Sequence, residues 1–319
     1  MSRFDEAAAQ AARARQAVLT KPAGSLGRLE DLAVFMAGWQ GRERPRIDRA
    51  QALVFAGNHG VVAQGVNPFP AEVTALMAQN FAAGGAAINQ LCRVADADLR
   101  VVPLDLDRPT ADFTTGPAMS AEEVVSAMQS GADAVDPDAD VLLLGEMGIG
   151  NSTVAAALAA ATFGGQAGDW IGPGTGASAE IMARKADAVS RGLALHAPSD
   201  TRGTLAAFGG REQAAICGAV MRARDLGIPV LLDGFICTAA AAVLTRDDPA
   251  ALAHCLIGHE SAEPGHRRLI EALALPIPPI LSLEMRLGEG SGAAVALMVL
   301  RSALACHDGM ATFAEAVIG

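Results

Sequence analysis

The hydrophobic positions of the chain form short continuous runs, separated by longer segments in which they recur at helical spacing. The runs lie at residues 52–56, 99–104, 141–144, 229–232, 255–257 and 277–283. Each run is too short for a helix and does not alternate with polar residues, which is typical of strands buried on both faces of a parallel sheet. Segments with helical spacing lie between the runs at residues 70–92, 120–131, 177–196 and 211–226. This alternation predicts a doubly wound α/β fold.

The two ends of the chain lack such runs and are predicted to be helical. The helical segments are expected at residues 4–19, 25–39, 293–307 and 311–317. In the second of these, Leu26, Leu29 and Leu32 recur at the spacing of one helix face. We therefore predict a large α/β domain at residues 46–284 and a smaller helical domain formed by residues 1–45 with 285–319.

Composition and charge narrow the class of protein. The 319 residues carry a formal net charge of -11, and no run of Lys or Arg could neutralise a row of phosphates, so nucleic acid is not an expected partner. No apolar run approaches the roughly 20 residues that span a membrane, and the first turns are too charged for an export signal. The 5 cysteines form no CxxC pair. We expect a cytoplasmic protein with reduced thiols and no membrane partner.

Glycine-rich loops follow several of the predicted strands. In open α/β sheets ligands bind beyond the carboxyl ends of the strands, so these loops should converge on one site. The turns at residues 148–153 and 172–176 each precede a helical segment, where backbone amides and the helix N-terminus favour an anion. Neither turn matches a Walker A loop. One such turn alone is most often only a turn, but two in one domain favour phosphate binding.

Lys185 is one of only two lysines in the chain, the other being Lys21. It lies about two turns into the helix predicted after the second glycine turn, from where its long side chain could reach an anion. A solvated position beside Glu180 explains the residue equally well.

Two glutamates in glycine-rich settings are candidates for acid–base chemistry. Glu146 and Glu289 each follow soon after an apolar run. Burial would raise the pKa of either carboxyl group toward the working pH, as a general base requires. A helix N-cap or a partner for the helix dipole is an equally good interpretation of these positions.

Histidines and nucleophiles give weaker signals. His59 directly follows a predicted strand, which makes it a candidate for the site. The cluster His254, Cys255, His259 and His266 matches no familiar zinc spacing, so no metal is expected. The chain has no GxSxG elbow, which disfavours a serine hydrolase.

Eight segments, spread over nearly the whole chain, together carry a resemblance to one family. In order they read KPAGSLGRLE from residue 21, GNHGV from 57, FPAEVT from 69, GGAAIN from 84, GEMGIGNST from 145, AFGGRE from 207, LDGFI from 232 and RLGEGSGA from 286. The chain resembles the nicotinate-nucleotide dimethylbenzimidazole phosphoribosyltransferases, which make the lower-ligand nucleotide of cobalamin. Members transfer the phosphoribosyl group of nicotinate mononucleotide to 5,6-dimethylbenzimidazole, giving alpha-ribazole 5'-phosphate and nicotinate.

The resemblance implies a Rossmann-like large domain, a small helical domain from both termini, a homodimer, and small-molecule substrates with no cofactor. It implies that Glu289 is the general base, and that the phosphoribosyl end is held by the glycine loops, Lys185 and the loop of Ser261. Phe69, Met77 and Met147 fall where the acceptor sits, and because the chain has no tyrosine, methionine and phenylalanine are its expected walls. The residues expected to bind substrate are Glu146, Met147, Gly148, Asn151, Gly174, Thr175, Gly176, Lys185, Ser261, Phe69, Met77 and His59.

Two other functions fit much of the same sequence. A nucleotide-sensing regulatory protein would keep the phosphate-binding turns but would not require Glu289. A glycosyltransferase that uses adenine or a phenol as acceptor would differ mainly at residues 69–77.

Overall fold

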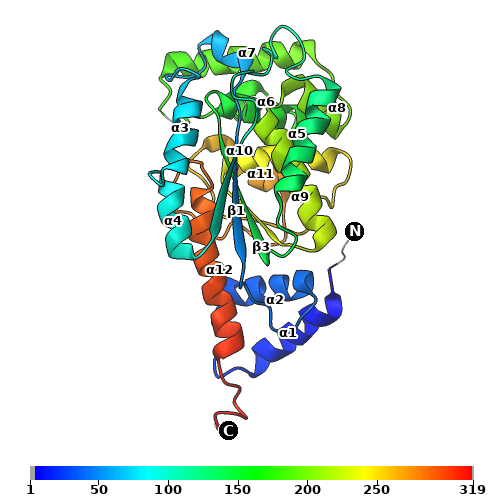
Figure 1. Ribbon diagram of the computed structural model, residues 1–319. Helices are drawn as coiled ribbons and strands as arrows, with labels where there is room; N and C mark the ends of the chain where they lie inside the picture. Colours follow the sequence, from blue (N-terminus) through cyan, green and yellow to red (C-terminus); the bar gives the residue numbers. More distant parts are fainter. Residues whose placement is uncertain (1–3, 175, 318–319) are drawn as a thin grey trace.

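A single parallel sheet organises the part of the chain that the computed structural model describes, residues 4–174 and 176–317 (Figure 1). Its strands there are β1 (Ala50–Ala56), β2 (Asp98–Pro103), β3 (Val141–Met147), β4 (Val230–Leu232) and β5 (Cys255–Ile257). They are ordered β2-β1-β3-β4-β5, and every neighbouring pair is parallel. The predicted Rossmann-like α/β fold is thus confirmed. The chain order reverses between β1 and β3, which is where folds of this type form a ligand crevice.

Helices cover both faces of the sheet. The α-helices of the described residues are α1 (Glu6–Val18), α2 (Arg28–Gln40), α3 (Val73–Ala82), α4 (Ala87–Ala95), α5 (Ala121–Ala134), α6 (Asn151–Phe163), α7 (Ala179–Leu195), α8 (Thr201–Phe208), α9 (Arg211–Leu226), α10 (Phe235–Ala242), α11 (Pro264–Leu273) and α12 (Ser291–Gly309). Successive residues of β3 alternate between two hydrophobic cores. Leu142 and Leu144 join the core under α5, α6, α9 and α10, whereas Val141 and Leu143 join the core under α2, α4 and α12. The continuous apolar runs follow from this burial on both faces.

Helices α5 and α9 pack closely because glycines lie at their contact. A Cβ atom on Gly131 would lie 1.9 Å from the carbonyl oxygen of Ala215. A Cβ atom on Gly218 would lie 1.8 Å from the carbonyl oxygen of Met128. The two glycines thus fix the distance between these helices, away from the loops at the carboxyl ends of the strands.

The terminal helices pack together beyond one end of the sheet, where α1 and α2 lie beside the last turns of α12 (Figure 1). Arg15 Nε donates a hydrogen bond of 2.8 Å to the carbonyl oxygen of His307. Leu32 and Met36 of α2 join the same hydrophobic core as β3. The association of the two chain ends agrees with the sequence analysis, and the division at residues 46–284 stays a prediction.

Three predicted elements differ from the structure. Residues 277–283 form no strand but only an isolated bridge between Leu281 and His259. Pro278 and Pro279 inside the run, and Pro276 just before it, lack the N–H groups of a ladder. Residues 70–92 form two helices, since the chain turns at Gly84 with a φ of +79°.

The third difference concerns residues 311–317, which form turns rather than a helix. They lie along the end of α1, where the Phe313 N–H donates to the carbonyl oxygen of Val18 at 2.9 Å. None of the helices in the described ranges is both long and apolar enough to cross a bilayer.

Candidate active site

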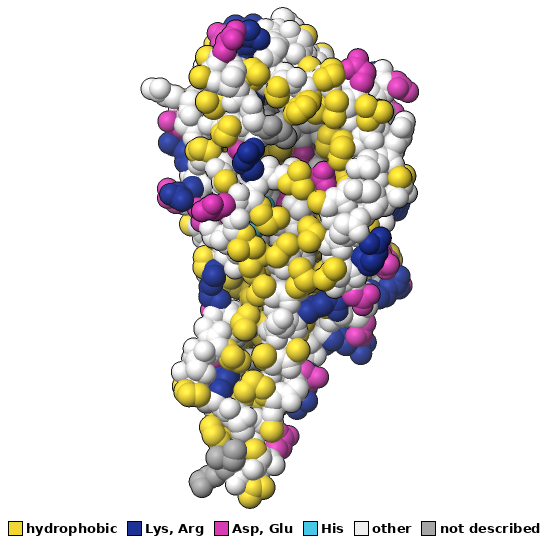
Figure 2. Space-filling model, turned by 90° about the vertical axis from the view of Figure 1, so that its left-hand side faces the viewer, with side chains coloured by type: hydrophobic (Ala, Val, Ile, Leu, Met, Phe, Trp, Pro, Cys, Tyr) yellow, Lys and Arg dark blue, Asp and Glu magenta, His cyan; other side chains and the backbone are white. Residues whose placement is uncertain are grey.

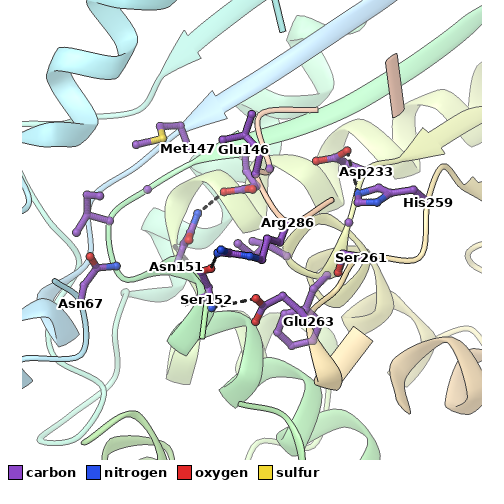
Figure 3. Close-up of a pocket in the computed structure, with 18 residues that line it drawn as sticks. Asn67, Glu146, Met147, Asn151, Ser152, Asp233, His259, Ser261, Glu263 and Arg286 are labelled. Atoms are coloured by element: carbon purple, nitrogen blue, oxygen red, sulfur yellow. Dashed lines mark hydrogen bonds and ion pairs between the residues drawn. The ribbon is translucent and has the colours of Figure 1, made fainter. Parts of the chain in front are cut away.

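A cavity opens at the carboxyl ends of β3, β4 and β5 (Figure 3). It holds about 730 Å³ of space, a figure that includes the part open to solvent. Figure 2 shows a face of the molecule with hydrophobic side chains along its middle, hollowed in its upper half, where acidic side chains are visible. Six of the predicted residues line the cavity: Glu146, Met147, Gly148, Asn151, Gly174 and Ser261.

Glu146 lies near the end of β3 with its carboxylate buried in the cavity wall. Asn151, at the start of α6, donates a hydrogen bond to it. Burial raises the pKa of Glu146 well above its ordinary value, and the nearby charges of Asp233 and Glu212 raise it further, while the bond from Asn151 opposes them. The side chain fits because a Cβ atom on Gly288 would lie 2.6 Å from Glu146 Oε1. Glu146 therefore favours its protonated form.

Asp233 follows β4 directly and is buried beside the N-terminus of α12. Its carboxylate accepts the N–H groups of Gly290 at 3.2 Å and Ala293 at 3.0 Å. Burial raises the pKa of Asp233 to about 7, although these N–H groups oppose the shift. His259 Nε2 lies 3.6 Å from Asp233 Oδ1, and burial lowers the pKa of His259 to about 4. A neutral imidazole therefore faces this carboxyl group at neutral pH.

Glu289 immediately precedes the N-cap of α12 and is buried next to the cavity wall. Its backbone has a φ of +63°, a left-handed conformation that is uncommon for a residue other than glycine. Its Oε2 atom is buried and has no hydrogen-bond partner within the described part of the chain. Burial raises the pKa of Glu289, and the N–H of Ile88 opposes this. The carboxylate is thus able to accept a proton.

The strain at Glu289 is accommodated by Gly145 in the neighbouring strand. A Cβ atom on Gly145 would lie 2.5 Å from the nitrogen of Gly290 and 2.6 Å from the carbonyl carbon of Glu289. The turn that holds Glu289 therefore rests directly on the backbone of β3.

Ser152, Gly174, Glu263 and Arg286 line the opposite part of the cavity, and Lys185 lies outside the wall in contact with Ser152. We define these five residues as the cradle. Lys185 Nζ donates to Ser152 Oγ at 3.0 Å and to the carbonyl oxygen of Gly172 at 3.2 Å. Lys185 is only 2% exposed, so the alternative of a solvated position beside Glu180 is wrong. Burial lowers the pKa of this lysine, and the charge of Glu263 opposes that shift.

Several predicted residues lie outside the cavity wall. His59 is buried behind Gly148, with its Nε2 atom 2.9 Å from Glu212 Oε1. Phe69 is 47% exposed, and Met77 packs against the core under α12. Gly176 adopts a φ of +111° and is not part of the wall either, and Thr175 lies outside the described residues.

Comparison with known proteins identifies the family. The sequence profile of a family described as phosphoribosyltransferase matches residues 1–318. A relative from Rhodobacter capsulatus, named nicotinate-nucleotide–dimethylbenzimidazole phosphoribosyltransferase, is 62% identical over 314 residues, which cover 98% of this chain and 93% of the relative. This chain belongs to that phosphoribosyltransferase family.

Other members extend the comparison to sequence and fold. A phosphoribosyltransferase of the same name from Mesorhizobium japonicum is 58% identical over 313 residues, covering 98% of this chain and 93% of its own length. The crystal structure of the nicotinate-nucleotide–dimethylbenzimidazole phosphoribosyltransferase from Thermus thermophilus matches with a TM-score of 0.92 at 39% identity, covering 99% of both chains. The chain thus shares its whole fold with this phosphoribosyltransferase family.

Several polar residues of the phosphoribosyltransferase site were not among the predicted ones. Asp233 follows β4 directly, a position that by itself could have identified it. Arg286 belongs to one of the family segments and donates to the carbonyl oxygen of Gly174. Glu263 is the N-cap residue of α11, and Glu212, which lies outside the cavity wall, is in the first turn of α9, so both resemble ordinary helix starts in the sequence.

The histidine cluster of this phosphoribosyltransferase makes contacts of other kinds. Among the described residues, no group of three or more His, Cys, Asp or Glu side chains is arranged to hold a metal ion. His266 Nδ1 accepts the N–H of Ser261 at 3.0 Å, and burial lowers the pKa of His266 to about 3. His254 Nε2 bonds the carbonyl oxygen of Val220 at 2.9 Å. His266 thus fixes the backbone of the loop at Ser261, and His254 fixes the backbone of α9.

Proposed function

We propose that this chain transfers the phosphoribosyl group of nicotinate mononucleotide to dimethylbenzimidazole or a related base and releases nicotinate. One observation carries the proposal. A single cavity joins buried carboxyl groups of raised pKa to a cradle that contains a buried lysine and a glycine turn. The names of the relatives, which cover nearly the whole chain, support the same substrates.

The donor requires no general acid. In nicotinate mononucleotide the pyridine nitrogen carries a positive charge while it is bonded to C1 of the ribose. The ring leaves with the bonding electron pair as a neutral base and takes up no proton. Acid–base catalysis is therefore needed only for the acceptor.

The acceptor must lose one proton. One nitrogen of the benzimidazole attacks C1 with its lone pair, and the N–H of the other nitrogen gives its proton to a base. A well-placed carboxylate contributes roughly 10²- to 10⁴-fold to such a step. Both oxygens of Asp233 accept backbone N–H groups, and Glu146 favours its protonated form. Glu289 accepts the N–H of Ile88 but keeps a buried second oxygen without a partner among the described residues. This contrast favours Glu289 as the general base.

The position of Glu289 beside the wall is compatible with that role, since catalytic hydrogen bonds commonly shorten only when the substrate binds. Met147, Phe235 and Leu287 supply apolar walls for a flat base. The cradle around Lys185 would anchor the phosphate. With the two rings on opposite sides of C1, direct displacement converts a β-linked donor into an α-linked product, and this alignment lowers the barrier.

Two finer predictions belong to the same proposal, namely that the chain forms a homodimer and that it works in the cytoplasm. Sedimentation velocity at micromolar concentration tests the first. A species of twice the chain mass supports it, and a monomer at all concentrations contradicts it. Fractionation of cells that contain a tagged chain tests the second.

The function is tested by incubating the protein with nicotinate mononucleotide and a panel of flat bases, while nicotinate release and product mass are followed. Release that depends on a benzimidazole supports the proposal. Donor binding without release would instead indicate a nucleotide-sensing protein. Products with adenine or phenols, but none with benzimidazoles, would indicate a different glycosyltransferase.

A further inference from the structure

Glu263 already binds one of the groups that are suited to hold the donor phosphate, the backbone N–H of Gly174. Its Oε1 atom accepts the backbone N–H of Gly174 at 2.9 Å. Its Oε2 atom is buried and has no hydrogen-bond partner among the described residues. The residue is only 7% exposed and lies in the cavity wall beside Ser152 (Figure 3). One of the chain's own carboxylates thus engages this end of the cavity.

The surroundings of Glu263 are those of an anion site. The charges of Lys185 and Arg286 and the N–H of Gly174 all favour its ionised form, although burial raises the pKa of Glu263 overall. A Cβ atom on Gly174 would lie 3.4 Å from both Lys185 Nζ and Ser152 Oγ, so the turn and the lysine are adjacent. A backbone amide, a hydroxyl group and two cations are the partners that a phosphate monoester prefers.

Two anions cannot occupy these partners together without strong repulsion. The Gly174 N–H is a single donor, and in a site of low dielectric two negative charges a few ångströms apart repel by several times RT. A phosphate that binds here must therefore take the N–H from Glu263 and outcompete it for Lys185. A donor that lacks the phosphate leaves the carboxylate where it is.

We propose that Glu263 is a specificity-determining residue of the donor site, which competes with the donor phosphate for Gly174, Lys185 and Arg286. The inference rests on the proposed function, because it assigns the phosphate of the donor to this cradle. Because of this competition, ligands that are weakly charged or lack a phosphate should bind poorly to the cradle. The competition also means that the Gly174 N–H leaves Glu263 only when a phosphate binds.

The substitution Glu263→Gln tests the competition, because it removes the charge while keeping the size and the oxygen that accepts the Gly174 N–H. Calorimetric titration at neutral pH and fixed ionic strength is carried out with nicotinate mononucleotide, nicotinate riboside and inorganic phosphate. We expect the mononucleotide and phosphate to bind about tenfold more tightly to the variant, a change of about 1.4 kcal/mol. The riboside should change by less than about twofold. Weaker or unchanged binding of the mononucleotide overturns the inference.

A matched control is Glu260→Gln, which removes the same charge from the same loop. The Glu260 carboxylate pairs with Arg267 at 3.0 Å outside the cavity wall. We expect Glu260→Gln to bind the mononucleotide with the same affinity as the unsubstituted protein. An equal increase in affinity in Glu260→Gln and Glu263→Gln would overturn the inference. Glu263→Ala, which frees the Gly174 N–H altogether, should tighten binding at least as much as Glu263→Gln.

The proposed function can fail separately. If the unsubstituted protein releases nicotinate with dimethylbenzimidazole and Glu263→Gln does not tighten phosphate binding, only the inference fails. If Glu263→Gln tightens phosphate binding but the unsubstituted protein releases no nicotinate with any base, only the proposed function fails.

Discussion

A single methyl group at Gly145 should displace the proposed base without altering any side chain that contacts a substrate. A Cβ atom there would lie 2.5 Å from the nitrogen of Gly290 and 2.6 Å from the carbonyl carbon of Glu289, whereas ordinary contacts begin at 3.4 Å. Both obstructing atoms belong to backbone and cannot rotate away. The turn must therefore move by about 0.9 Å, the difference between 3.4 and 2.5 Å. A misplacement of about 1 Å costs roughly 10²-fold in rate, so we expect kcat to fall by about 10²-fold in Gly145→Ala.

The assay is steady-state release of nicotinate with saturating dimethylbenzimidazole. The KM for nicotinate mononucleotide should change little, because the atoms nearest to the new methyl group belong to Glu289 and Gly290, which are not part of the cradle. We expect the overpacking to lower the free energy of unfolding by about 1–3 kcal/mol, which leaves the protein folded. Gly116→Ala is the matched control, since a Cβ atom there meets nothing within 4 Å. An unchanged kcat in folded Gly145→Ala would refute the placement of Glu289 at the reacting atoms.

Four further outcomes are expected. Lys185→Ala should raise the KM for nicotinate mononucleotide by roughly 10- to 100-fold, the worth of a charge-assisted hydrogen bond, and a fall in kcat alone would contradict phosphate anchoring. Glu289→Gln should bind the donor and lose roughly 10²- to 10⁴-fold in turnover, which near-normal turnover would disprove. Gly131→Ala should lower the free energy of unfolding by at least about 1–3 kcal/mol in urea titrations without changing kcat, because the new methyl group meets the carbonyl of Ala215. Burial raises the pKa of Asp233 from 3.8 to about 7, so its contribution to stability is complete below about pH 4 and is lost as the pH rises through about 7. Urea titrations from about pH 4 to 8 should show the free energy of unfolding falling with pH in the unsubstituted protein, and falling less in Asp233→Asn.

The sheet was predictable because both of its faces are covered by helices. Burial on both sides makes β1 and β3 continuous apolar runs, a pattern that few other elements produce. The run at residues 277–283 is equally apolar but forms no strand, because hydrophobicity reports burial and not the ability to donate ladder hydrogen bonds. The two prolines within the run, and the one just before it, were the available signal.

Part of the site was predictable because one loop carries several of its residues. Glu146, Gly148 and Asn151 lie within six residues of one another after β3, and the order of the strands places that loop at the crevice. Glu263 reaches the cradle from the start of α11, and only the folded chain brings it to Gly174. Phe69 was named on the resemblance alone and lies outside the cavity wall, so its role toward the acceptor stays a prediction.

The central claim is direct transfer of phosphoribose between two rings in one cavity. Its most direct test is to incubate the protein with nicotinate mononucleotide and dimethylbenzimidazole and to determine the product by mass and by the NMR signal of its anomeric proton. The account predicts one nicotinate released for each α-linked ribotide formed, and no release without the base. Nicotinate release that yields free ribose 5-phosphate, or a β-linked product, would contradict it.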